Sequence, residues 1–194
     1  MTARTNTQNQ QLIADELRAA ISSALKEHPQ TLFFYPTPAV PAKGVRVELS
    51  SETAALLSKA VSEVALRNSV EYSVESDVSF EKDRVVVKVT LRFATIKVQR
   101  VGEAALTSTS ATTGEIRQND AAVRTAETRA FKRALEALAG DIVLSWLRFA
   151  ESFALTQLQT ANAAAAQASK FEQVLVFSRF MQRTFADYVK QKQK

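Results

Sequence analysis

The chain has 194 residues, 46% of them hydrophobic, and a formal net charge of +5. A chain of this length and composition can bury a core of its own, so wholesale disorder is excluded. The absence of cysteine excludes disulfides, thiol catalysis and thiolate metal sites, and the presence of only one histidine, His28, excludes a multi-histidine metal site.

Other functions are disfavoured by what the sequence lacks. No apolar run is long enough to span a bilayer and no charged-then-apolar leader opens the chain, so we expect no membrane partner. The expected location is intracellular, either cytoplasmic or nucleoid-associated, and a viral origin is open. There is no glycine-rich phosphate loop and no catalytic constellation, so we expect neither an enzyme nor a cofactor or metal.

Residues 1–68 are predicted to form two helices on either side of a proline-rich segment. Residues 8–26 repeat apolar side chains at helical spacing, and this helix ends before Pro29. Residues 28–43 hold all four prolines and the run Phe33-Phe34-Tyr35, whose rings either anchor a wrapping segment to the core or stack on unpaired bases. A short strand over 45–49 and a helix capped by Ser50 or Ser51 follow.

Residues 71–93 alternate between apolar and polar side chains, which predicts a β-hairpin. A tight turn at residues 82–83 places Phe80 opposite Val85, and it places Val78 opposite Val87. Tyr72 then lies opposite residue 93, so every apolar pair lies on the same face. On the other face the same register pairs residues 77 and 88, which carry opposite charges.

The alternation changes parity near residues 94–95, which predicts a bulge or bend in one long strand. Gly102 is interpreted as a turn into a third strand, which runs through Ala104, Leu106 and Ser108. A loop rich in serine and threonine, with Gly114, leads to the next element.

An amphipathic helix is predicted over residues 123–138. Either Asn119 or Asp120 caps its start, and Gly140 ends it in a left-handed conformation. Glu127 falls within the apolar stripe, where we expect it to pair with Arg124 or with a strand cation. The apolar stripe consists of Val123, Ala126, Ala130, Phe131, Ala134, Leu135 and Leu138, and the opposite side carries Arg129, Lys132 and Arg133.

Residues 141–194 contain no proline or glycine and predict a long helical arm with a bend near Ser169. An apolar stripe in its last part begins near Phe171 and ends near Tyr188. This stripe packs either on its own domain or on a neighbouring subunit, and a protruding apolar arm favours oligomers. We therefore divide the chain into a nucleic-acid-binding core, residues 1–140, and a C-terminal helical arm, residues 141–194, as the oligomerisation element.

Positive charge is concentrated between residues 84 and 134, where ten cations face four anions. Such a surplus favours a polyanionic partner. The candidate nucleic-acid-binding residues are Lys88, Arg92, Lys97, Arg100 and Arg117 before the basic helix, and Arg124, Arg129, Lys132 and Arg133 on it.

The order of hairpin, third strand and a helix reading ETRAFKRALEALAG resembles the single-strand annealing proteins of homologous recombination. This superfamily includes the eukaryotic recombination mediator and the phage Erf and Red-beta proteins. The resemblance covers residues 70–140, and its most specific part is the segment 132–135 followed by Gly140. It implies a β-β-β-α core, a ring-shaped oligomer, and phosphate contacts by Lys132 and Arg133 that leave the bases exposed for pairing.

The sequence as a whole predicts an α+β fold, in which a small antiparallel sheet is backed by helices and a helical arm follows. The predicted function is ATP-independent binding and annealing of single-stranded DNA by a homo-oligomer. One alternative is a structural or assembly protein, such as a viral or nucleoprotein shell subunit, whose basic helix neutralises packaged nucleic acid. Another is a single-strand or RNA binder that does not anneal.

Overall fold

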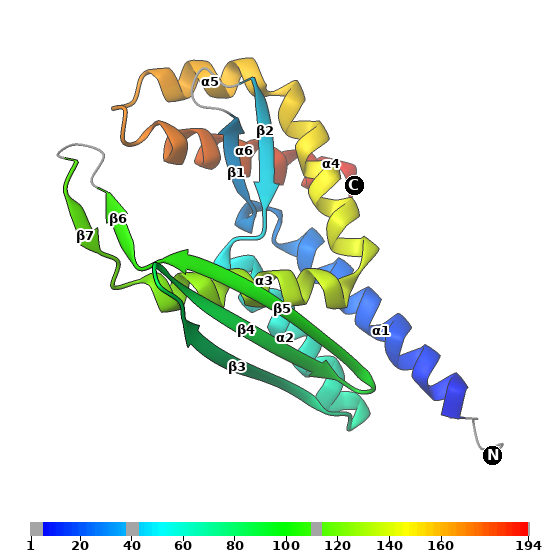
Figure 1. Ribbon diagram of the computed structural model, residues 1–194. Helices are drawn as coiled ribbons and strands as arrows, with labels where there is room; N and C mark the ends of the chain where they lie inside the picture. Colours follow the sequence, from blue (N-terminus) through cyan, green and yellow to red (C-terminus); the bar gives the residue numbers. More distant parts are fainter. Residues whose placement is uncertain (1–5, 38–42, 110–113, 194) are drawn as a thin grey trace. The chain divides into compact units, whose positions relative to one another are not determined.

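The computed structural model describes residues 6–37, 43–109 and 114–193, and its fold is α+β. The chain forms two compact units (Figure 1). Unit 1 comprises Met1–Ile13 and Ser58–Gly140, and unit 2 comprises Ala14–Leu57 and Asp141–Lys194. The helices are α1 (Asn6–Glu27), α2 (Ser51–Asn68), α3 (Ala122–Ala139), α4 (Asp141–Thr156), α5 (Leu158–Ala166) and α6 (Gln173–Lys192), with a 3-10 turn at Pro29–Thr31. The strands are β1 (Phe33–Thr37), β2 (Gly44–Glu48), β3 (Tyr72–Phe80), β4 (Arg84–Phe93), β5 (Ile96–Ala105), β6 (Thr107–Thr109) and β7 (Ile116–Gln118).

Each unit combines segments that are far apart in the sequence. Residues 14–57 lie in the same unit as the C-terminal helices. The reason is that the β1–β2 ribbon packs on α6 and α4, which bury its apolar side chains.

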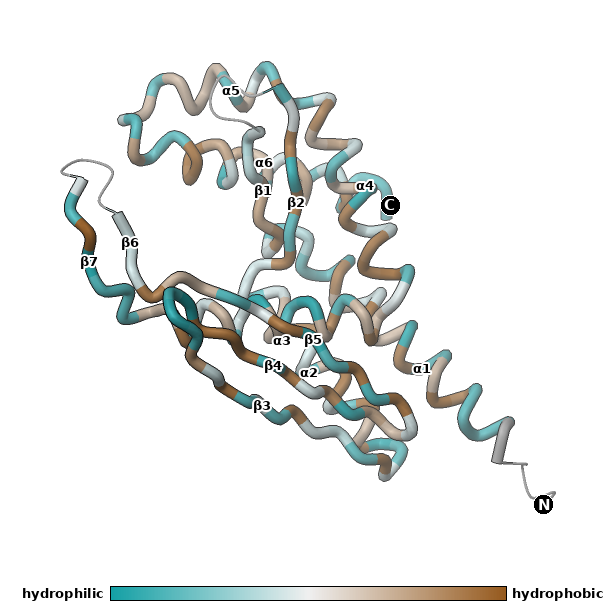
Figure 2. Tube along the Cα trace, viewed as in Figure 1, coloured by the Kyte–Doolittle hydropathy of each residue, from teal (hydrophilic) through white to brown (hydrophobic). Residues whose placement is uncertain are grey.

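The central sheet of unit 1 has the strand order β3-β4-β5 and is antiparallel throughout. The expected hairpin register is confirmed, including the pairs Phe80 with Val85 and Asp77 with Lys88. The odd-numbered side chains of β4, from Val85 to Phe93, are almost completely buried. Figure 2 colours the same strand by hydropathy and shows hydrophobic stretches along it. The sequence pattern thus determined which face of the hairpin became the core.

The third strand differs from expectation in two ways. Instead of one bent strand, β4 ends at Phe93 and a two-residue turn leads into β5 at Ile96, with Ala94 at a φ of 50°. A residue with positive φ at this point closes the hairpin and explains the parity change. Gly102 lies within β5 and is not a turn, and residues 107–109 form a separate ribbon with β7.

Helix α3 confirms the predicted basic helix, and it packs on β5 and β4 (Figure 1). Its N-cap position is Ala121 without a side-chain cap, so the expected caps are wrong: the side-chain amide of Asn119 donates instead to the carbonyl of Ala105. Gly140 does end the helix, with a φ of 60° and its N–H donating to the carbonyl of Glu136.

The core of unit 2 is built around aromatic side chains of α4 and α6. Phe34 of β1 is fully buried against Phe185, so the middle ring of the aromatic run is a core anchor. Phe185 also contacts Trp146, Phe149 and Phe153 of α4. The part of the expected apolar stripe from Phe177 to Phe185 therefore packs within its own chain, whereas Phe171, at the start of that stripe, is 80% exposed.

The C-terminal segment is not a protruding arm. Helix α4 ends at Thr156, α5 follows after one residue, and residues 167–172 turn the chain so that α6 packs back on α5 and on β1. The expected bend near Ser169 is present: the Ser169 hydroxyl donates to Glu172, and the N–H of Glu172 donates to the carbonyl of Ser169. Burial of Phe177 and Met181 outweighs continuation of a straight helix.

Candidate nucleic-acid interface

Helix α3 lies unusually close to the sheet of unit 1. Its buried face is a row of alanines spaced four residues apart, from Ala122 to Ala134. Opposite this row is Gly102, where an added Cβ would lie 2.0 Å from the carbonyl oxygen of Ala126 and 2.6 Å from the nitrogen of Ala130. Small side chains on both sides therefore bring the helix backbone against β5, within reach of the edge of that strand.

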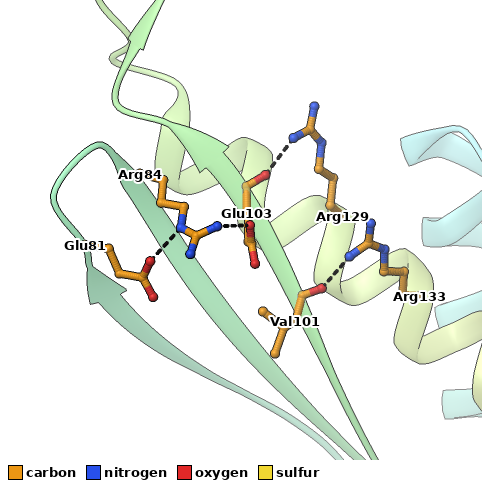
Figure 3. A network of polar contacts seen from close by, with 6 residues as sticks. All are labelled: Glu81, Arg84, Val101, Glu103, Arg129 and Arg133. Carbon is orange, nitrogen blue, oxygen red and sulfur yellow. Dashed lines mark hydrogen bonds and ion pairs between the residues drawn. The ribbon is translucent and has the colours of Figure 1, made fainter.

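Two arginines of α3 bind the outer edge of β5. Arg129 Nη1 donates to the carbonyl of Glu103 at 2.6 Å, and Arg133 Nη1 donates to the carbonyl of Val101 at 2.7 Å (Figure 3). The next alternate carbonyl, that of residue 99, accepts a hydrogen bond from Arg100 Nη1 at 2.8 Å. Because alternate carbonyls of a strand point the same way, all three lie on one side of β5.

We call Arg100, Arg129 and Arg133, together with the carbonyls that they bind, the arginine-lined edge. All three side chains are on residues exposed to solvent. A guanidinium has five N–H donors, so each arginine keeps donors for a further ligand after binding one carbonyl. The carbonyls restrict the positions of the guanidinium groups, which lowers the entropy that an anionic ligand would have to remove.

The cations on the solvent face of the sheet are largely compensated. Lys88 pairs with Asp77 at 3.1 Å, and Arg92 lies 3.7 Å from Glu75. Of the expected site residues, these two therefore add little net charge to the surface. They lie on β4, whereas the arginine-lined edge follows the far side of β5.

The remaining expected site residues lie around this edge or apart from it. Arg124 is exposed on the first turns of α3, and Lys97 is exposed near the start of β5. Lys132 is half-buried, next to Arg133 on α3. Arg117 lies on β7 and pairs with Glu115 at 2.7 Å, so its charge is compensated.

Arg84 was not expected to belong to this region, although it organises the start of β4. Its guanidinium pairs with Glu81 at 2.6 Å and with Glu103 at 2.9 Å (Figure 3). The hydrogen bond that Arg84 donates to Glu81 and the charge of Glu103 raise the pKa of Arg84 above its ordinary value. Glu103 thus binds Arg84 through its carboxylate and Arg129 through its backbone carbonyl. From the sequence alone, the pairing of Arg84 with Glu103 could have been inferred only if the register of β4 with β5 had been known.

The carboxylate of Glu127 does not lie in the apolar stripe of α3 as expected. It is exposed and accepts a hydrogen bond of 2.6 Å from the hydroxyl of Ser76 on β3. The expected pairing with Arg124 or a strand cation is thus replaced by a neutral donor. The buried stripe is narrower than predicted: it consists of the alanine row with Leu135 and Ala139, whereas Val123 is exposed and Phe131 and Leu138 are half-buried.

No family model, curated protein or solved structure matches this chain.

Within residues 6–37, 43–109 and 114–193, no three side chains of histidine, aspartate or glutamate gather as metal ligands would. Over the same ranges, none of the helices combines the length and the apolar character needed to cross a bilayer. The arginine-lined edge is the candidate site because its guanidinium groups have donors suited to anionic oxygen atoms.

Proposed function

We propose that the protein binds single-stranded DNA along the arginine-lined edge and promotes the annealing of complementary strands. The observation that supports this proposal is the alignment of three guanidinium groups on successive outer carbonyls of β5. Guanidinium groups match the geometry of phosphate oxygens, and binding of phosphate releases condensed counterions. The edge thus offers a sequence-independent contact to a nucleic-acid backbone.

The spacing of the arginines suits a chain of phosphates. Arg129 and Arg133 are four residues apart on α3, which corresponds to about 6 Å along the helix axis. Arg124 is exposed on the first turns of the same helix, where the helix dipole also favours anions. A strand held by its phosphates keeps its bases free, and annealing requires free bases.

The annealing activity itself rests on the resemblance of residues 70–140 to the single-strand annealing superfamily. The support from the fold is the chain order, in which β3 to β5 are followed by the β6–β7 ribbon and then by α3. Nucleotide hydrolysis has no part in the proposal, since phosphate contacts and free bases suffice. Subunit assembly is a separate question, because the C-terminal helices pack within unit 2 and do not form the arm that was expected to join subunits.

The test compares three double variants in binding and annealing of labelled oligonucleotides. Arg129→Gln with Arg133→Gln removes both charges and is expected to weaken binding at least about ten-fold. It should also lower the slope of log K against log salt by about 1.4, since each lost phosphate contact contributes about 0.7 on a single strand. Lys88→Gln with Arg92→Gln is the matched control, because it removes the same charge from compensated positions and should change the slope little.

The variant Arg129→Lys with Arg133→Lys distinguishes two roles of these arginines, which are to supply positive charge to a ligand and to cover the edge of β5. Lysine keeps the charge but not the fork-shaped donor set, so this variant should retain most of the affinity and of its salt dependence. Equal losses in the lysine and glutamine variants would show that the arginines serve only to cover the strand edge, and would refute the proposal. Binding that blocks pairing of complementary strands would instead favour a coat protein, and a preference for RNA would favour an RNA binder.

A further inference from the structure

The aromatic run of β1 is divided between the two faces of the strand. Successive side chains of a strand point to opposite faces, so Phe33 and Tyr35 lie on the face opposite Phe34. Phe34 is completely buried, whereas Tyr35 is 40% exposed and Phe33 is half-buried. The run therefore combines one core anchor with a pair of rings on the outer face of the β1–β2 ribbon.

The two outer rings contact each other. The ring centroids of Phe33 and Tyr35 lie 4.4 Å apart, and their planes are tilted by 47°. A ring has two faces, and this contact uses at most one face of Tyr35. The next residue on the same side of β1 is Thr37, and its partner on β2 is Gly44, which has no side chain. The Tyr35 ring is thus supported by Phe33 on one side and has only small residues on the other.

Charge next to these rings is compensated. Arg46 of β2 lies opposite Tyr35, and it forms an ion pair with Glu48, which lies opposite Phe33. We call these four residues the aromatic platform. It offers ring area and a flat guanidinium group without net charge, so it suits a flat uncharged ligand better than a free anion.

Helices hold the ribbon at both of its outer edges. A two-stranded ribbon is at best marginally stable by itself. Here the N–H of Phe34 donates to the hydroxyl of Ser178 on α6, and the N–H of Val47 donates to the carboxylate of Glu151 on α4, each at 3.2 Å. The same bonds occupy edge donors that an added strand would need. The platform is therefore fixed before a ligand binds, and a ligand must contact its side-chain face.

We propose that the aromatic platform is a binding site for unpaired nucleobases, in which a base stacks on the ring of Tyr35. Aromatic side chains on the exposed face of a sheet are the means by which one class of RNA-binding domain stacks bases. Such stacking tolerates any sequence, because every base has a π-face. Phe33 supports the Tyr35 ring, and the guanidinium of Arg46 extends the flat surface.

Stacking is compatible with the annealing of strands. A stacked base gives its face to the ring and keeps its pairing edge free. Inside a duplex the faces of the bases are covered by neighbouring base pairs, so the platform binds single strands and not their annealed product. The role in annealing rests on the proposed function, whereas the stacking of a base on Tyr35 does not, because the platform lies in unit 2 and the arginine-lined edge lies in unit 1.

The first experiment adds adenosine, a nucleoside without phosphate, to the whole protein with isotope-labelled tyrosine rings. The chain has three tyrosines, of which Tyr72 is hydrogen-bonded to Ser58 and Tyr188 is stacked on Phe153. Adenosine at millimolar concentration is expected to shift the ring resonances of Tyr35 upfield and to leave the other two unchanged. Ribose alone should have no effect. Unchanged Tyr35 resonances, or equal shifts of all three tyrosines, would overturn the proposal.

The second experiment compares a single strand with an abasic strand of the same length, by fluorescence anisotropy. Tyr35→Leu is expected to weaken binding of the normal strand at least about five-fold and to leave the abasic strand unchanged. Tyr35→Phe keeps the ring and should bind the normal strand within about two-fold of the unchanged protein. Phe171→Leu is the matched control, because it removes an aromatic ring of unit 2 that is 80% exposed and lies outside the platform. It should change neither affinity, and circular dichroism verifies that each variant is folded.

Salt dependence separates this proposal from the proposed function. The ratio of the two affinities should stay constant as salt is raised, since the platform has no net charge, whereas both affinities fall through the phosphate contacts. Arg129→Gln with Arg133→Gln should weaken both strands alike and keep the ratio. Equal binding of both strands by the unchanged protein would refute the platform and leave the proposed function standing. Absence of any strand binding would refute the proposed function, and the adenosine experiment would then decide on the platform alone.

Discussion

Gly102 is the position where one added methyl group should disturb unit 1 most. A Cβ added at this residue would lie 2.0 Å from the carbonyl oxygen of Ala126, and ordinary contact begins near 3.4 Å. Helix and strand must therefore separate by about 1.4 Å. The two crowded atoms, the carbonyl oxygen of Ala126 and the nitrogen of Ala130, belong to the helix backbone and cannot rotate away as a side chain would. Overpacking of this kind costs typically about 1–3 kcal/mol, and we expect Gly102→Ala to lie at or above the upper limit.

Two probes report on this change. Trp146 is the one tryptophan of the chain and lies in unit 2, so its fluorescence follows that unit during urea unfolding. Amide hydrogen exchange of α3 and β5 follows unit 1, and in Gly102→Ala it should accelerate by at least about a hundred-fold, the equivalent of about 3 kcal/mol. The matched control is Ala105→Val, which enlarges an exposed side chain on the opposite face of β5 and should change stability by less than about 0.5 kcal/mol.

The same substitution should weaken nucleic-acid binding, because the positions of Arg129 and Arg133 depend on the closeness of α3 to β5. Unchanged exchange rates in Gly102→Ala would refute the reasoning, since they would mean that α3 does not lie against the Gly102 backbone. Slower exchange in the Ala105→Val control would not affect this conclusion.

Three further predictions concern stability. Phe185→Ala should destabilise unit 2 by about 3–5 kcal/mol in urea unfolding followed by Trp146 fluorescence, since the ring contacts four other aromatic side chains. Ser50→Ala should cost about 1 kcal/mol, because the Ser50 hydroxyl accepts the N–H of residue 53 at the start of α2; an unchanged urea midpoint would contradict this. Burial raises the pKa of Tyr72 above 10, and its hydrogen bond with residue 58 offsets this only in part. The unfolded chain therefore loses the Tyr72 proton first, so the stability from the neutral hydroxyl is complete below pH 10 and decreases as the pH rises through the raised pKa. Tyr72→Phe should remove this part of the pH dependence, which is measured by urea unfolding on both sides of pH 10 and by tyrosinate absorbance.

The hairpin and the basic helix were predicted from the sequence because the apolar residues of each recur with one regular period. Alternation over residues 71–93 fixes both the face and the register, since a slip by one residue would expose every valine of β4. The turn at Ala94 was missed because alanine has no preference for positive φ, and a parity change fits a bulge equally well. Gly102 was misread because glycine serves both turns and close packing, and only the position of α3 distinguishes the two roles.

The candidate site was predicted less completely than the fold. The sequence placed Arg129 and Arg133 on the exposed side of a helix, but it gave no sign that they reach the carbonyls of β5. That contact depends on the distance between helix and strand, which is a tertiary property. The compensation of Lys88 by Asp77 followed from the register of the hairpin and was anticipated.

The path of the chain through unit 2 has a consequence for synthesis. Phe34 and its partner Phe185 are separated by the whole of Ser58–Gly140, which forms the larger part of unit 1. At translation rates of about 5–20 residues per second, the second residue is added about 8–30 s after the first. During this interval β1 and β2 exist without α6, so Phe34 of the nascent chain stays exposed to solvent until α6 has left the ribosome.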